Sequence, residues 1–107
     1  MTINIFDEYV QYHDAAIKSY GPKTCVFLHA GQFYEFYMFC PDEETIIGPN
    51  LWEIQEILQI IVTNRNKSKP HSRKNVYMMG VQTISKNKFA NMLLSEGWTV
   101  VIVDQVT

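Results

Sequence analysis

Amphipathic helical segments alternate with short β-rich runs along the chain, and this alternation limits the possible folds more than any other feature. Apolar residues recur at spacings of three and four from Phe6 to Tyr20, with Asn4 in the N-cap position. Two further helices are expected to begin at Asn50 and Ser85. The β-rich runs are residues 24–30, 33–39, 60–63, 76–82 and 98–106. The order αββαββαβ predicts an α/β fold, a mixed β-sheet flanked by helices.

The length and composition predict one domain. A chain of 107 residues, 47% hydrophobic and 19% charged, buries enough apolar surface to fold without disulfides. No apolar run approaches the ~18 residues that span a bilayer, and residues 1–5 lack the basic start of a signal peptide. We therefore expect a soluble, intracellular protein with no membrane partner. Runs 60–63 and 98–106 are apolar enough to predict a buried and a central strand.

Positive charge is concentrated in one predicted loop. Five of the nine Lys and Arg residues lie between positions 65 and 74, without any acid, whereas the remaining chain carries four basic and eleven acidic residues, a balance of −7. Attraction to phosphate would therefore be focused on this loop, although a solvated surface loop is the alternative interpretation. The candidate phosphate contacts are Arg65, Lys67, Lys69, Arg73 and Lys74.

A carboxylate lies within the aromatic run 33–39. In a strand, Phe33 and Glu35 would share one face of the sheet, with Tyr37 and Phe39 beyond them. In the simpler interpretation, Glu35 lies at a strand end and reaches solvent. In the alternative, the phenyl ring stacks on a nucleic-acid base while the carboxylate meets the edge of that base.

Four segments resemble the mismatch-recognition domain of the MutS family, in the order found in that family and over roughly residues 18–106. The run Gly31-Gln32-Phe33-Tyr34-Glu35 resembles its Gly-Asp-Phe-Tyr-Glu motif. The other similar segments are residues 61–65, 78–81 and 89–105. The chain departs from the family pattern at Gln32, Gln82, Ile84, Val103 and Asp104. The resemblance identifies residues 1–107 as a MutS-like mismatch-recognition domain I, a piece of a longer protein.

The resemblance implies DNA mismatch recognition. Phe33 would stack on and wedge beside a mispaired or unpaired base, Glu35 would hydrogen-bond its edge, and Thr63 and Met78 would lie near the groove. The partner would be mismatched double-stranded DNA. The parent protein would be an ATPase that uses ATP and Mg²⁺ in other domains and forms a MutS-type dimer through them. A similar module used for DNA structure or protein interaction, without mismatch specificity, is the alternative.

The remaining polar residues indicate a binding module without a catalytic or metal site of its own. The chain has no phosphate-binding Gly-Lys-Ser/Thr loop. Its two cysteines, in apolar runs, are interpreted as small hydrophobic side chains, and its three histidines have no partners at metal-ligand spacing. A metal-dependent nuclease would need clustered acids. Asp42, Glu43 and Glu44 are clustered, but they lie in a loop between two prolines without a His or Lys nearby.

Overall fold

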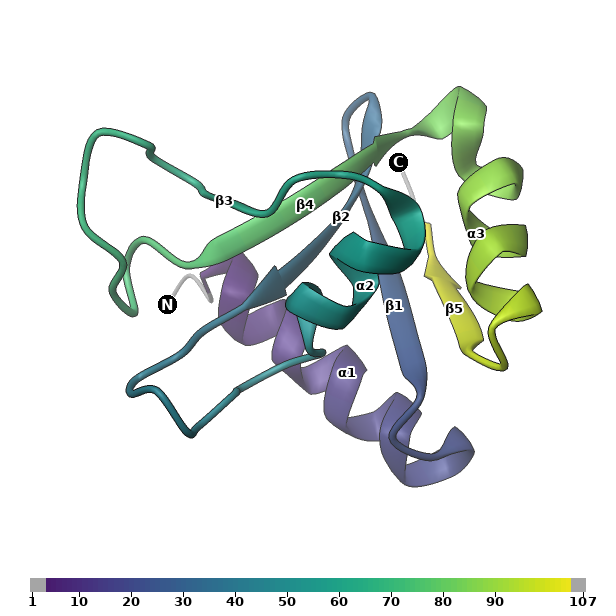
Figure 1. Cartoon of the computed structure of the whole chain (residues 1–107), viewed down its shortest axis with the longest axis horizontal. Coiled ribbons are helices and arrows are strands. Elements are labelled where there is room, and N and C mark those ends of the chain that lie inside the picture. Colours follow the sequence, from purple (N-terminus) through teal and green to yellow (C-terminus); the bar gives the residue numbers. More distant parts are fainter. Residues whose placement is uncertain (1–3, 105–107) are drawn as a thin grey trace.

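The computed structural model describes residues 4–104, which form a five-stranded mixed sheet with helices on both faces (Figure 1). The elements are α1 (Ile5–Tyr20), β1 (Thr24–Ala30), β2 (Phe33–Met38), α2 (Leu51–Leu58), β3 (Thr63–Asn64), β4 (Tyr77–Gln82), the 3-10 turn η1 (Thr83–Ser85), α3 (Lys86–Ser95) and β5 (Thr99–Val103). The strand order is β3-β4-β2-β1-β5. Only β1 and β5 pair in parallel. The predicted α/β class and mixed sheet are confirmed.

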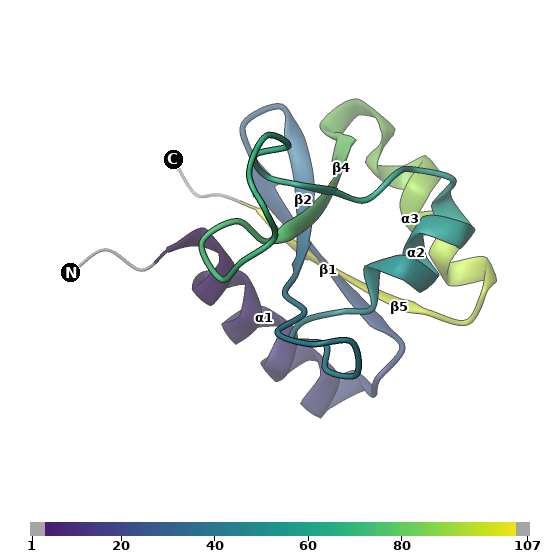
Figure 2. The ribbon, with the colours of Figure 1, turned by 60° about the vertical axis from the view of Figure 1, so that its left-hand side comes forward.

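Different helices cover the two faces of the sheet, as Figure 2 shows. On the α1 face, the Tyr9 hydroxyl donates to the Val26 carbonyl at 2.7 Å, and the Tyr9 ring centroid lies 5.5 Å from that of Tyr37. α2 and α3 lie on the other face, where the Leu51 N–H donates to the Met38 sulfur at 3.3 Å. Alternate residues of β2 therefore point toward different helices.

The start and the stripe of α1 follow the sequence prediction. Asn4 Oδ1 accepts from the backbone N–H groups of Phe6 and Asp7 at 2.9 and 3.1 Å, so the predicted N-cap is confirmed. The stripe is buried over its first three turns, whereas Tyr20 is 62% exposed. The last turn of α1 lies outside the hydrophobic core, so Tyr20 is exposed although it continues the apolar stripe.

The β1–β2 connection is a two-residue turn, Gly31 and Gln32, that closes directly on the pair Ala30 and Phe33. Gly31 has a φ of 62°, which glycine adopts without a side-chain penalty. The tight turn places Phe33 at the extreme end of the hairpin. At the other end, β2 stops at Met38, so the strand predicted for residues 33–39 is one residue too long.

Two predictions about strand position were wrong. Residues 60–63 are not a buried strand, because Ile61 is 77% exposed and only Thr63–Asn64 pair with β4. The Val62 N–H donates to the Gln55 side chain of α2 at 2.8 Å, so it is not available for a strand ladder. β5 lies at an edge of the sheet, not at its centre. Its apolar residues pack against the core; the last part of the predicted run, residues 105–106, lies outside the described residues.

The prediction of a Ser85 cap was also wrong. Ser85 ends η1, and its side chain makes no capping hydrogen bond to α3. At the other end, the Trp98 N–H donates to the Leu93 carbonyl at 3.0 Å across Gly97, whose φ is 83°, so α3 stops where the sequence predicts. None of the helices among residues 4–104 has the length and apolarity needed to cross a membrane.

Candidate nucleic-acid interface

Phe33 and Glu35 lie side by side on the α1 face of the sheet, above Gly80 of β4. Glu35 pairs with Gly80, and a methyl group placed on Gly80 would lie 3.7 Å from Cδ1 of Phe33 and 3.8 Å from Cγ of Glu35. Phe33 is 41% exposed and Glu35 is half-buried. In Figure 1 the β1–β2 turn extends beyond α1, which crosses the opposite part of the sheet. An aromatic ring and a carboxylate are thus presented together on an uncovered part of one face.

Tyr37 fixes the direction of the Glu35 side chain. Its hydroxyl donates to Glu35 Oε1 at 2.5 Å, and its ring is 1% exposed. Burial, and then the hydrogen bond to the carboxylate, raise the pKa of Tyr37, so it remains a donor at neutral pH. The guanidinium carbon of Arg65 lies 5.8 Å from the Tyr37 ring centroid. From the sequence, Tyr37 was expected on this face but had no assigned role; its spacing of two from Glu35 was the available signal.

Thr63 and Met78 extend the same face across the sheet. Met78 pairs with both Tyr37 and Thr63, and directly paired residues of antiparallel strands project to the same side. Both side chains are half-buried. The candidate residues Phe33, Glu35, Thr63 and Met78 therefore occupy one surface that crosses β2, β4 and β3.

The basic loop (residues 65–74) is held in a defined shape by Asn75, which is 6% exposed. Asn75 Oδ1 accepts from the Asn66 N–H at 2.8 Å, and its Nδ2 donates to the carbonyls of Asn66, Lys69 and Pro70, each at 3.0 Å. A hollow of about 320 Å³ lies beside this amide. Its lining includes three cationic side chains, those of Arg65, Lys69 and Lys74. This hollow is suited to an anion such as a phosphate group.

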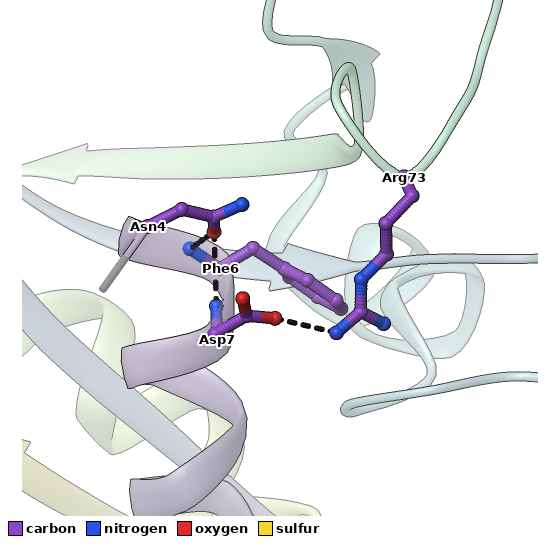
Figure 3. A network of polar contacts seen from close by, with 4 residues as sticks. All are labelled: Asn4, Phe6, Asp7 and Arg73. Carbon is purple, nitrogen blue, oxygen red and sulfur yellow. Dashed lines mark hydrogen bonds and ion pairs between the residues drawn. The ribbon is translucent and has the colours of Figure 1, made fainter. Parts of the chain in front are cut away.

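Arg73 is engaged within the chain by an ion pair and by aromatic rings. It forms an ion pair with Asp7 at 2.5 Å (Figure 3). Its guanidinium carbon lies 4.8 Å from the Phe6 ring centroid and 5.7 Å from that of Phe39. Figure 3 shows the guanidinium beside the helix start that Asn4 caps. Arg73 therefore attaches the basic loop to the first turn of α1. Lys67 is exposed.

His71 links the basic loop to β2 and β3. The Cys40 N–H donates to His71 Nε2 at 3.1 Å, which requires a lone pair on that nitrogen. The proton is then on Nδ1, which lies 2.9 Å from Asn64 Oδ1 and donates to it. The ring also stacks on Tyr77 at 3.8 Å. Burial lowers the pKa of His71, which favours this neutral form.

The two cysteines lie in different environments. Cys25 is fully buried, and burial raises the pKa of its thiol, in agreement with its interpretation as a hydrophobic side chain. Cys40 is half-buried and also free. Within residues 4–104, no three His, Cys, Asp or Glu side chains are grouped so that they could hold a metal ion.

Comparison with known proteins identifies the family of this chain. The family model described as MutS domain I matches residues 9–107. The DNA mismatch repair protein MutS of Leuconostoc citreum is 33% identical over 97 residues, which is 91% of this chain and 10% of that protein. The MutS protein of Desulfatibacillum aliphaticivorans is 35% identical over 91 residues (85% and 9%). A mutS homolog of Acanthamoeba polyphaga mimivirus is 31% identical over 105 residues (94% and 9%).

The matches cover almost all of this chain but only a small part of each relative. The chain spans about a tenth of the length of the curated relatives that it matches. The match over residues 9–107 spans the elements from within α1 to β5. The chain belongs to the MutS family, and it corresponds to domain I of that family.

Proposed function

We propose that this chain is a DNA-binding module of mismatch repair that recognises a mispaired or unpaired base. The observation that carries the proposal is the placement of Phe33 and Glu35 together above Gly80, on a part of the sheet that α1 leaves open. The Phe33 ring stacks on the base and wedges into the adjacent base step. The Glu35 carboxylate accepts a hydrogen bond from the edge of the same base.

Two opposing terms give this arrangement its selectivity. Stacking of a base on an aromatic ring contributes about 1–3 kcal/mol and tolerates any base. The carboxylate, by contrast, is repelled by phosphate and disfavours tight binding to an ordinary duplex. A mispair has already weakened stacking and pairing, so opening that step costs less than opening a matched one. Discrimination therefore comes mainly from the deformability of the DNA.

Tyr37 acts as a positioning residue for Glu35. Its hydroxyl holds Oε1 along the strand, which leaves Oε2 as the acceptor for the base. Because the Tyr37 ring is buried against α1, the carboxylate is held by a rigid part of the fold. Rigid placement lowers the entropy that ordering this side chain would otherwise cost on binding.

The basic loop supplies the contacts to the DNA backbone. Arg65, Lys69 and Lys74, around the hollow beside Asn75, bind phosphate groups, with Lys67 available beyond them. Such contacts position a protein on DNA without reading sequence, and they weaken as salt rises. We assign Arg73 mainly to holding the loop on α1, since its guanidinium is already engaged there. Thr63 and Met78 complete the surface that faces the groove.

The proposal includes a longer parent protein of the MutS type. By family resemblance that protein carries the ATPase, binds ATP and Mg²⁺ in other domains, and forms a dimer through them. Residues 1–107 would be its mismatch-recognition domain I. The alternative function, a DNA-structure or protein-interaction module without mismatch specificity, does not require the Phe33 and Glu35 pair.

The test is an NMR titration of the 107-residue chain with two short DNA duplexes, one carrying a single mispair and the other fully paired. We expect the backbone signals of Phe33 and Gly80 to shift more strongly with the mispaired duplex. Phe33→Ala should remove this difference and leave the salt-dependent binding through the basic loop. Tyr20→Ala, which removes an exposed aromatic ring from α1, is the control.

Equal shifts with both duplexes in the unmodified chain would exclude mismatch reading and favour the alternative function. A Phe33→Ala variant that keeps the full preference would exclude Phe33 as the reading residue. No shift with either duplex at low salt would contradict DNA binding by this module.

A further inference from the structure

A second aromatic cluster lies at the other end of β2 from Phe33. A pocket of about 410 Å³ opens there between the acidic loop (residues 41–49) and the start of α2. Its lining includes an aromatic side, formed by Trp52, His71 and Tyr77, and an acidic side, formed by Asp42 and Glu43. The proposed DNA-reading function does not use this pocket.

The aromatic side of the pocket is preorganised but not closed. Tyr77 stacks on His71 with ring centroids 3.8 Å apart, and Trp52 meets Tyr77 edge-on at 4.9 Å and an interplanar angle of 67°. Trp52 nevertheless remains 41% exposed, so its indole is accessible from the pocket. The faces of aromatic rings carry partial negative charge and attract cations, the indole most strongly.

The acidic side of the pocket carries net negative charge. Asp42 accepts hydrogen bonds from the Glu44 N–H at 2.9 Å and from the Thr45 hydroxyl at 3.1 Å, and these bonds lower the pKa of Asp42. Its carboxylate is therefore both fixed and ionised. Between residues 4 and 104 the only ion pair is that of Arg73 with Asp7, so the carboxylates of Asp42 and Glu43 have no cationic partner within the described chain.

We propose that this pocket binds an arginine side chain of a protein partner. A planar guanidinium stacks on the accessible indole and donates N–H groups in its own plane to the two carboxylates. A lysine ammonium is more strongly hydrated and is not planar, so we expect it to bind the indole and the carboxylates less strongly than a guanidinium does. Nucleic acid does not fit, since the carboxylates repel phosphate. The proposal is independent of mismatch reading at the opposite end of β2.

The test uses three short blocked peptides, Gly-Arg-Gly, Gly-Lys-Gly and Gly-citrulline-Gly, titrated into the 107-residue chain. Citrulline keeps the shape of arginine without its charge. We expect the indole N–H signal of Trp52 to shift saturably with the arginine peptide, at a Kd in the millimolar range, severalfold more weakly with lysine and not with citrulline. Asp42→Asn combined with Glu43→Gln should weaken arginine binding by about threefold to tenfold.

Trp52→Ala, followed through the backbone signal of Thr45, should abolish binding, whereas the control Tyr20→Ala should leave it unchanged. Mismatch preference should survive Trp52→Ala, which separates this proposal from the proposed function. The proposal is overturned if citrulline shifts the indole as arginine does, if lysine binds as tightly, or if no saturable shift occurs up to about 10 mM peptide. It is also overturned if a DNA duplex shifts the indole while the arginine peptide does not.

Discussion

The acidic loop and the basic loop contrast in charge and in how they are held. The acidic loop is closed mainly by short-range contacts, namely the bridge between Phe39 and Ile47 and the hydrogen bonds of Asp42 to its own turn. The basic loop depends on Asn75, which directly follows it and bonds its backbone, and on His71 and Arg73, whose side chains contact other segments. Like charges repel, so a loop that concentrates five cations needs anchors from outside its own turns.

The contrast also separates two binding chemistries in one small domain. The hollow beside Asn75 is lined by cations of the basic loop, which begins directly after β3. The pocket at the end of β2 away from Glu35 is lined by carboxylates and by the Trp52 indole. A phosphate group and an arginine side chain are therefore directed to different places. Four tests of this contrast follow, in order of decreasing expected effect.

Asn75→Ala should have the largest effect, because it removes the side chain at the centre of the basic loop. Four hydrogen bonds of a buried side chain are lost, and backbone groups of Asn66, Lys69 and Pro70 lose this partner, which we expect to cost about 2–4 kcal/mol of the free energy of unfolding. Urea denaturation measures this cost. Asn87→Ala, at an exposed position of α3, is the control. A loss no larger than that of the control would show that the loop does not depend on Asn75.

Tyr37→Phe should weaken mismatch discrimination by about threefold to tenfold, since the lost hydrogen bond frees the Glu35 carboxylate to rotate. The affinity ratio between mispaired and paired duplexes measures it. Tyr34→Phe is a closely matched control, because Tyr34 donates to the carboxylate of Asp104 from the opposite face of β2. Equal effects of the two changes would indicate a general loss of stability, without a special role for Tyr37.

Arg73→Ala and Lys69→Ala should separate anchoring from phosphate binding. Arg73→Ala should lower the free energy of unfolding by about 1 kcal/mol, through loss of an exposed ion pair and of the cation–π contact with Phe6. Lys69→Ala should leave stability nearly unchanged and reduce the slope of log affinity against log salt by about 1. A reduced slope in the Arg73 variant instead would place that residue among the phosphate contacts.

Acidification should produce the smallest of the four effects, a gradual loss of stability. Burial lowers the pKa of His71 in the folded state below its ordinary value near 6.5. The unfolded chain therefore binds a proton first, and the contribution of neutral His71 is complete above pH 6.5 and lost as the pH falls below it. His13, whose pKa burial also lowers, acts in the same direction.

Urea denaturation at pH 7.0 and pH 5.5 tests this expectation. The wild-type chain should lose more stability between these two pH values than His71→Gln does. Identical losses in the two chains would show that His71 is not involved.

Local patterns were sufficient for several predictions. Asn4 and Asn50 cap the helices that follow them because a cap needs only a side chain and the next three backbone N–H groups. Phe33 and Glu35 share a face because successive residues of a strand alternate. Their side chains are presented as the alternation predicts, with the ring exposed and the carboxylate beside it.

Predictions that depended on lateral position in the sheet were less successful. The apolar composition of the run at 98–106 predicts packing against a core, but it does not distinguish a central strand from an edge strand such as β5. The run at 60–63 is apolar as well. There the Gln55 side chain accepts a hydrogen bond from the Val62 N–H, and the residues of the run do not predict this contact.

Local sequence patterns were enough to predict the α/β class, the helix starts at two asparagines, and the placement of a ring and a carboxylate on one face of β2. Each of these depends on residues within a few positions of one another, where backbone geometry fixes the outcome. The engagement of Arg73 and the exposure of the Trp52 ring depend instead on contacts between distant segments. Arg73 meets Asp7 from 66 residues away, and Trp52 joins His71 and Tyr77 from different segments, since such contacts arise when the sheet brings distant segments together.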